Sequence, residues 1–156
     1  LAENAGGGRS EIEAAFLSGR AAEIFGRMVA TLGGPADFVE QPARHLQAAP
    51  VIRDIFAEQS GFVTAIDTRA IGIAVVELGG GRMRAADAID HSVGFTALAS
   101  LGAEAGKDAP IGTVHAQDDA AADRATKALR AAYQIGDAAP PPGETVYERI
   151  APPAQS

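Results

Sequence analysis

The 156-residue chain has no cysteine and no tryptophan, and aromatic residues make up only 5% of it. Without cysteine it can form no disulfide bond, thiolate nucleophile or cysteine-ligated zinc site. It has no apolar run near the roughly 20 residues that a membrane helix needs. Its first residues also lack the basic start and apolar stretch of a signal peptide. We therefore expect no membrane contact and a cytoplasmic location, with which the lack of cysteine is compatible.

Basic residues are also scarce, because 13 Lys and Arg face 20 Asp and Glu, for a formal net charge of -7. Such a chain is not attracted to nucleic acid or to an anionic membrane, so we expect neither as a partner. An anionic substrate could bind only in a local basic or amide-lined pocket. Hydrophobic residues at 47% and charged residues at 21% are typical of a folded globular protein.

Residues 1–49 are predicted to be helical. Ser10 and Glu13 fit a capping box at the start of a short helix that ends near Leu17. A second helix carries one strong apolar stripe: Ile24, Phe25, Met28, Val29 and Leu32. This stripe needs a partner surface, either residues from 50 onward or a domain outside this chain. The first residue is Leu1 and not Met, which suggests an excised fragment, with N-terminal processing as the alternative.

From Pro50 the pattern predicts strands and helices together. Two strands are expected at Val51–Glu58 and Phe62–Asp67. Asp67 or Thr68 then caps a helix to about Leu78 that is apolar on nearly all sides and should be buried, with Gly79 at its end. The β-branched residues of this segment make a strand the lesser alternative.

Further along, Ile89, His91, Val93 and Phe95 alternate as a strand does. Pro110 can open a strand that covers Ile111–His115. Asp118 or Asp119 caps a long helix over about 120–135, and Val146–Ile150 is a final strand.

The fold class is therefore predicted to be α+β. A helical N-terminal appendage (1–49) precedes a domain at 50–156 with mixed or antiparallel strands. The strands do not alternate regularly with helices, which disfavours a doubly wound parallel sheet.

The loop from Gly79 to Arg84 is the most suggestive local feature. Glycines let backbone amides approach an anion, and arginines add charge-assisted contacts. The candidate anion contacts are Gly80, Gly81, Arg82 and Arg84. The loop lacks the lysine and Ser/Thr of a phosphate-binding loop and follows a helix where such a loop opens one. The alternative is a helix end followed by a turn.

Other polar residues give weaker indications. His91 and His115 lie on predicted strands, where a hydrogen-bonded structural role is ordinary and a metal site across the strands is the alternative. Ser92 does not fit a nucleophile arrangement with its neighbour His91, because adjacent strand residues point to opposite faces. Asp118, Asp119 and Asp123 are explained by a helix start. We expect no catalytic residue, no metal and no cofactor in this chain.

Several segments occur in an order that resembles the thymidine phosphorylase (pyrimidine-nucleoside phosphorylase) family. They are GRAAEIF (19–25), LGGPADF (32–38), APV (49–51), TRA (68–70), ELGGGR (77–82), DAID (87–90), SVGF (92–95), VHA (114–116) and VYER (146–149). Each segment is short, but together they cover about residues 10 to 150.

The resemblance implies a C-terminal part of an enzyme that converts thymidine and inorganic phosphate to thymine and 2-deoxyribose 1-phosphate in pyrimidine nucleoside metabolism. Family members are homodimers in which a cleft separates a helical domain from an α/β domain, and closing the cleft excludes water. The α/β domain ends in a hammerhead-type subdomain, which corresponds here to about Pro50 onward.

The family's phosphate-binding segment, Lys-His-Ser-Thr-Gly-Gly, does not occur in this chain, nor do the upstream residues that hold the pyrimidine. No catalytic residue therefore carries over. The chain is expected to be an inactive scaffold by itself, with the Gly79–Arg84 loop facing the cleft of the whole enzyme.

Two other classes of function remain open. The chain could be a stand-alone binding or carrier module, since hammerhead subdomains have relatives among lipoyl and biotin carriers. Carriers present a lysine on a hairpin tip. The lysines here are Lys127, which lies in a predicted helix, and Lys107, which lies in a loop whose geometry the sequence leaves open. It could also be a dimerisation module whose sticky surface is the apolar helix at 21–32.

Overall fold

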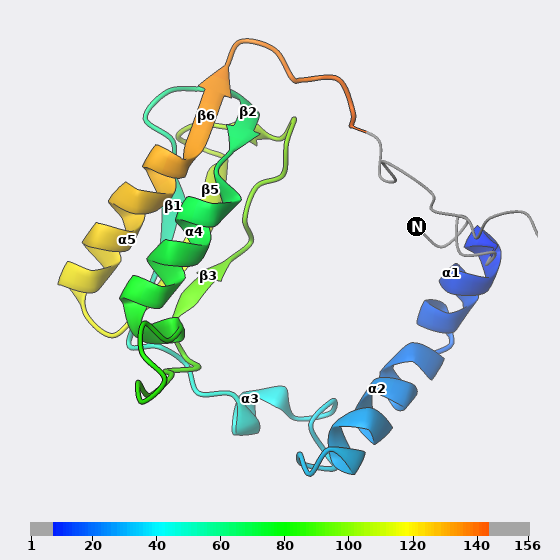
Figure 1. Ribbon diagram of the computed structural model, residues 1–156. Helices are drawn as coiled ribbons and strands as arrows, with labels where there is room; N and C mark the ends of the chain where they lie inside the picture. Colours follow the sequence, from blue (N-terminus) through cyan, green and yellow to red (C-terminus); the bar gives the residue numbers. More distant parts are fainter. Residues whose placement is uncertain (1–7, 144–156) are drawn as a thin grey trace, which may run out of the picture. The chain divides into compact units, whose positions relative to one another are not determined.

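The computed structural model describes residues 8–143, which fall into two compact units. The first contains residues 8–45 together with Gly143, and the second is Leu46–Pro142. The elements of each unit are labelled in Figure 1. None of the helices in the described residues is both long and apolar enough to cross a membrane.

The first unit consists of three helices, α1 (Arg9–Leu17), α2 (Arg20–Thr31) and the single turn α3 (Pro42–His45). The predicted capping box is wrong, because Ser10 lies inside the first turn of α1 and Gly8 is the N-cap. The Gly8 N–H instead donates to the Glu11 carboxylate at 3.4 Å. Helix α2 ends close to where Gly33 and Gly34 predict its end, and Gly33 adopts a left-handed φ of 89°.

The second unit is built on two three-stranded sheets in which all strand pairs are antiparallel. One sheet has the order β1 (Val51–Phe56), β5 (Pro110–Ala116), β3 (Gly94–Thr96). The other has the order β4 (Glu104–Ala105), β2 (Gly61–Ile66), β6 (Tyr133–Gly136). In the first sheet Asp54 pairs with Thr113 and Thr96 pairs with Thr113 on its other side.

Two helices lie side by side in the second unit: α4 (Thr68–Val75) and α5 (Asp119–Ala132). Asp67 and Asp118 cap them as the sequence predicts, since their carboxylates accept the N–H groups of Ala70 at 2.9 Å and Ala121 at 2.6 Å. Helix α5 packs on β1 and β5. The core includes Ile55, Val63, Ile111, Val114 and Leu129, all at most 1% exposed.

Three predictions for the second unit are wrong. Helix α4 is buried only at Ile71 and Ala74, and Ile73 lies half exposed. The segment from Ile89 to Val93 is a turn and not a strand, so His91 is an exposed turn residue. The predicted helix to residue 135 ends at Ala132, after which Tyr133 begins β6. The strand predicted at Val146–Ile150 lies outside the described residues.

Candidate functional site

The Gly79–Arg84 loop leaves α4 through a π-helical turn, Val76–Gly80, in which Gly79 has a left-handed φ of 96°. Gly80 and Gly81 are required by packing. A Cβ on Gly80 would lie 2.9 Å from a methyl of Val75, and one on Gly81 would lie 2.7 Å from a methyl of Val76. These two glycines therefore have a structural reason to be glycine, independent of any ligand.

The backbone amides of the loop already hold a carboxylate. Asp87 Oδ2 accepts the N–H groups of Met83 at 3.1 Å and Arg84 at 2.7 Å. The Asp87 N–H donates to the Arg84 carbonyl at 3.0 Å. These two amides are therefore already bonded to Asp87, and an incoming anion would have to be bound by side chains. Arg82 and Arg84 are exposed, and neither takes part in an ion pair among residues 8–143.

Asp90 closes the same loop and bonds it to Gln117, the residue that follows β5. Its N–H donates to the Gly79 carbonyl at 2.9 Å. Its carboxylate accepts the Ser92 hydroxyl at 2.6 Å, the Ser92 N–H at 2.9 Å and the Gln117 amide at 2.6 Å. The Ser92 hydroxyl first, and then the Ser92 N–H, hold the pKa of Asp90 below its usual value. A carboxylate with a lowered pKa is a weak base, so Asp90 is poorly suited to activate Ser92.

The two strand histidines of the sequence prediction have separate surroundings. His115 lies on β5, and its Nε2 is 2.8 Å from the hydroxyl of Thr96 on β3. His91 is exposed in the turn before β3. Within the described part of the chain, no group of three or more His, Asp or Glu side chains is placed to hold a metal ion.

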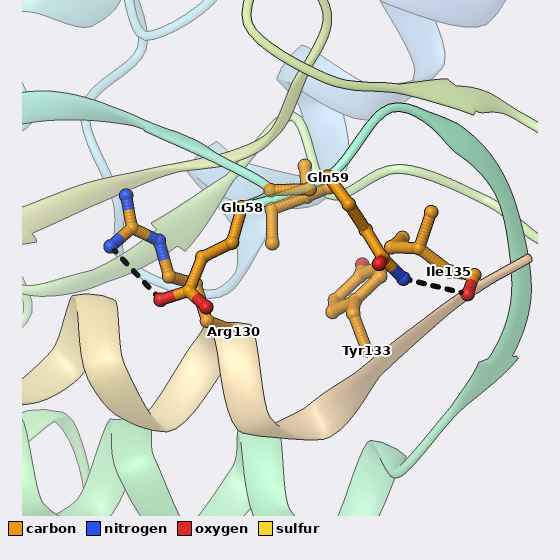
Figure 2. A pocket seen from close by; sticks show the side chains of 7 residues that line it. Glu58, Gln59, Arg130, Tyr133 and Ile135 are labelled. Atoms are coloured by element: carbon orange, nitrogen blue, oxygen red, sulfur yellow. Dashed lines mark hydrogen bonds and ion pairs between the residues drawn. The ribbon is translucent and has the colours of Figure 1, made fainter.

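A cavity of about 280 Å³ lies between the turn after β1 and the end of α5 (Figure 2). Ile111, Tyr133 and Ile135 give it an apolar lining, and Glu58, Gln59 and Arg130 provide the polar groups. Sequence reasoning missed this cavity, because its walls come from three segments that are far apart along the chain: 57–59, Ile111 and 130–135. The only local signal was Tyr133, which the sequence placed on a helix.

The polar groups of this cavity are already paired. Arg130 Nε donates to the Phe56 carbonyl at 2.8 Å, and Arg130 Nη1 lies 4.0 Å from the Glu58 carboxylate. Gln59 donates to the Ile135 carbonyl at 3.1 Å, as Figure 2 shows. The Tyr133 hydroxyl donates to the Ala99 carbonyl at 2.9 Å, and burial raises its pKa. This arrangement joins α5 and β6 to the turn after β1, and it pairs no nucleophile with a base.

Lys107 lies at the tip of a tight hairpin. Gly106 and Ala109 exchange two backbone hydrogen bonds, of 3.1 and 3.3 Å, which leaves Lys107 and Asp108 as the two tip residues. The Lys107 side chain is 88% exposed, with its amine 3.8 Å from Asp108. The sequence left the geometry of this loop open, and Lys127 lies on α5.

Comparison with known proteins gives two findings. Residues 62–136 match the family described as pyrimidine nucleoside phosphorylase C-terminal domain. Over 152 residues the chain is 51% identical to the thymidine phosphorylase of Burkholderia lata (strain 383). The match covers 96% of this chain and 34% of the relative, so the chain spans about a third of that relative's length.

Proposed function

The chain belongs to the pyrimidine nucleoside phosphorylase family through its C-terminal domain, and on this premise we propose that it is the C-terminal part of a thymidine phosphorylase. The whole enzyme converts thymidine and inorganic phosphate to thymine and 2-deoxyribose 1-phosphate. The observation that carries the proposal is the 51% identity to the Burkholderia enzyme, which extends over 96% of the chain. The enzyme acts in the cytoplasm, in pyrimidine nucleoside metabolism, as a homodimer.

Within that enzyme this chain acts as a scaffold. The polar side chains that could take part in chemistry have structural partners instead. Ser92 donates to Asp90, His115 lies against Thr96, and Tyr133 donates to a backbone carbonyl. The Ser92–Asp90 and Thr96–His115 pairs each place a hydroxyl within hydrogen-bond distance of a possible base. The lowered pKa of Asp90 makes it a weak base, and no other side chain of the described residues hydrogen-bonds His115 to orient it for catalysis.

The direct test is a hybrid in which this chain replaces the corresponding third of the Burkholderia enzyme. We expect the hybrid to release thymine from thymidine only when phosphate is present, which an absorbance assay follows. The unmodified Burkholderia enzyme is the positive control. A hybrid that folds, as judged by its circular dichroism and unfolding transition, yet releases no thymine would contradict the proposal.

We also propose that the Gly79–Arg84 loop faces the cleft and that Arg82 and Arg84 attract the anionic substrate. The exposure of both side chains and their lack of an ion-pair partner among the described residues support this. Replacing both with Ala in the hybrid should raise the KM for phosphate by about fivefold, the scale of an exposed charge contact. Arg69→Ala is the matched control. An unchanged KM for phosphate in the double variant would show that Arg82 and Arg84 do not contribute to substrate binding.

A stand-alone carrier module is the second candidate, and the position of Lys107 at a hairpin tip favours it. Carriers need a lysine that a modifying enzyme can reach, and this one is exposed. Intact-mass analysis of the chain purified from its native host decides the matter. An added acyl mass that disappears in Lys107→Arg would support the carrier, and an unmodified mass would exclude it.

A further inference from the structure

Helix α2 carries an apolar surface that we call the α2 stripe: Ile24, Phe25, Met28 and Leu32. These four side chains are between 45% and 80% exposed. The opposite face is polar, with Glu23 and Arg27 forming an ion pair at 4.0 Å. An amphipathic helix with its apolar side exposed is typical of a surface that another protein segment covers.

The residues that follow α2 cover only one edge of this stripe. Phe38 packs edge-on against Phe25, with ring centroids 6.1 Å apart. Val39 lies close to Gly26, where an added Cβ would be 3.3 Å from its methyl. A hydrogen bond between His45 and Asp37 at 2.8 Å and an ion pair between Arg44 and Asp37 at 3.9 Å hold this return segment in place. Met28 and Leu32 remain half exposed or more, on a helix whose end is fixed by the bond from Gly34 N–H to Val29 O.

The first unit has no core of its own to stabilise this arrangement. None of residues 8–45 is buried. A helix of 12 residues is marginal in water without tertiary packing, so α2 needs a surface to pack against.

We propose that the α2 stripe docks on the polypeptide that precedes this chain in the full-length phosphorylase. The matched family is a C-terminal domain at residues 62–136, so the two-thirds of the relative that the chain does not cover precede it. Helix α2 lies on that same N-terminal side of the matched domain. The proposal rests on the proposed function only in that it takes the chain to be part of a longer phosphorylase.

The test measures hydrogen exchange of the α2 amides in the 156-residue chain and in the hybrid with the Burkholderia enzyme. Docking predicts that these amides exchange about 100-fold more slowly in the hybrid, because exchange then requires the stripe to separate from its partner. In the hybrid, Met28→Ser should restore fast exchange in α2 while β5 and α5 stay protected. Glu23→Ser, on the polar face of the same helix, should leave α2 protected.

Equal exchange rates for α2 in the chain and in the hybrid would overturn the proposal. Slow exchange of the α2 amides in the isolated 156-residue chain would also overturn it. If that protection grows with protein concentration, the occupant is a second copy of the chain, and if it does not, the occupant is the second unit.

If the hybrid fails to fold, the preceding part of the Burkholderia enzyme is mixed with the chain and the same exchange is measured. Loss of thymine release with α2 still protected would reject the proposed function and leave the docking in place.

Discussion

The two units of the chain use their apolar residues in opposite ways. In the second unit, side chains such as Leu129, Val63 and Val114 are completely buried between two small sheets and two helices. In the first unit, Phe16, Leu17 and Leu32 are 71%, 89% and 80% exposed. Apolar content alone therefore does not make a region self-sufficient. What matters is whether the same segment also supplies the opposing surface.

The largest predicted difference between the units comes from one substitution made in each. Leu129→Ala should lower the free energy of unfolding of the second unit by about 2–5 kcal/mol, because it leaves a cavity in a closed core. Leu32→Ala should change the free energy of unfolding of the first unit by less than about 0.5 kcal/mol in the 156-residue chain, since this side chain is exposed. Urea unfolding followed by circular dichroism measures both. Equal effects would mean that the first unit has a core of its own.

Helix caps give a second, smaller contrast. Asp118→Ala should destabilise the second unit by about 1 kcal/mol, because the N–H of Ala121 loses its acceptor. Ser10→Ala should have almost no effect, since its side chain does not cap α1. Thermal unfolding measures the stability of both variants. If Ser10→Ala lowered stability as much as Asp118→Ala, the capping box that the sequence predicted would be correct after all.

Tyr133 tests the link between β6 and the loop before β4. Tyr133→Phe keeps the packing but removes the bond to the Ala99 carbonyl, which should cost about 1 kcal/mol. Because burial raises the pKa of this hydroxyl above 10.0, its contribution is complete below pH 10 and is lost as pH rises toward the folded value. Chemical denaturation at neutral and at alkaline pH compares the variant with the native chain. A pH-independent difference would contradict this account.

The smallest effect concerns Asp90. Its folded pKa lies below the ordinary 3.8, so its stabilising contribution is complete above pH 3.8 and is lost as pH falls through the folded value. The stability difference between the native chain and Asp90→Asn should therefore be present at neutral pH and shrink in acid. Hydrogen exchange of the Ser92 N–H reports the same loss locally. A difference that persists unchanged in acid would contradict the assignment.

The parts of the fold that the sequence predicted are those with local causes. Asp67 and Asp118 cap helices because each carboxylate lies three residues before its N–H partner. Strands β4 and β6 were missed because they are short and are defined by pairing with β2, which lies far away in the sequence. The alternation from Ile89 to Phe95 predicted a strand, but the Asp90 carboxylate bonds the Ser92 N–H and makes a turn.

The Gly79–Arg84 loop could also be predicted only in part from the sequence. The sequence located its glycines and arginines, but it did not indicate that Asp87 would occupy the amides of Met83 and Arg84. An aspartate three residues after Arg84 was the available signal, because such a side chain can reach back to a nearby backbone amide. The π-helical turn brings Gly80 and Gly81 close to Val75 and Val76. No sequence pattern predicted this turn.

The most direct test of the central claim is a thymidine phosphorolysis assay on the 156-residue chain itself, at high protein concentration with saturating phosphate. The account predicts no thymine release above the rate without protein, because the chain contributes a scaffold and none of the reacting groups. Phosphate-dependent thymine release by the chain alone would contradict it, and would place a complete catalytic site within these residues.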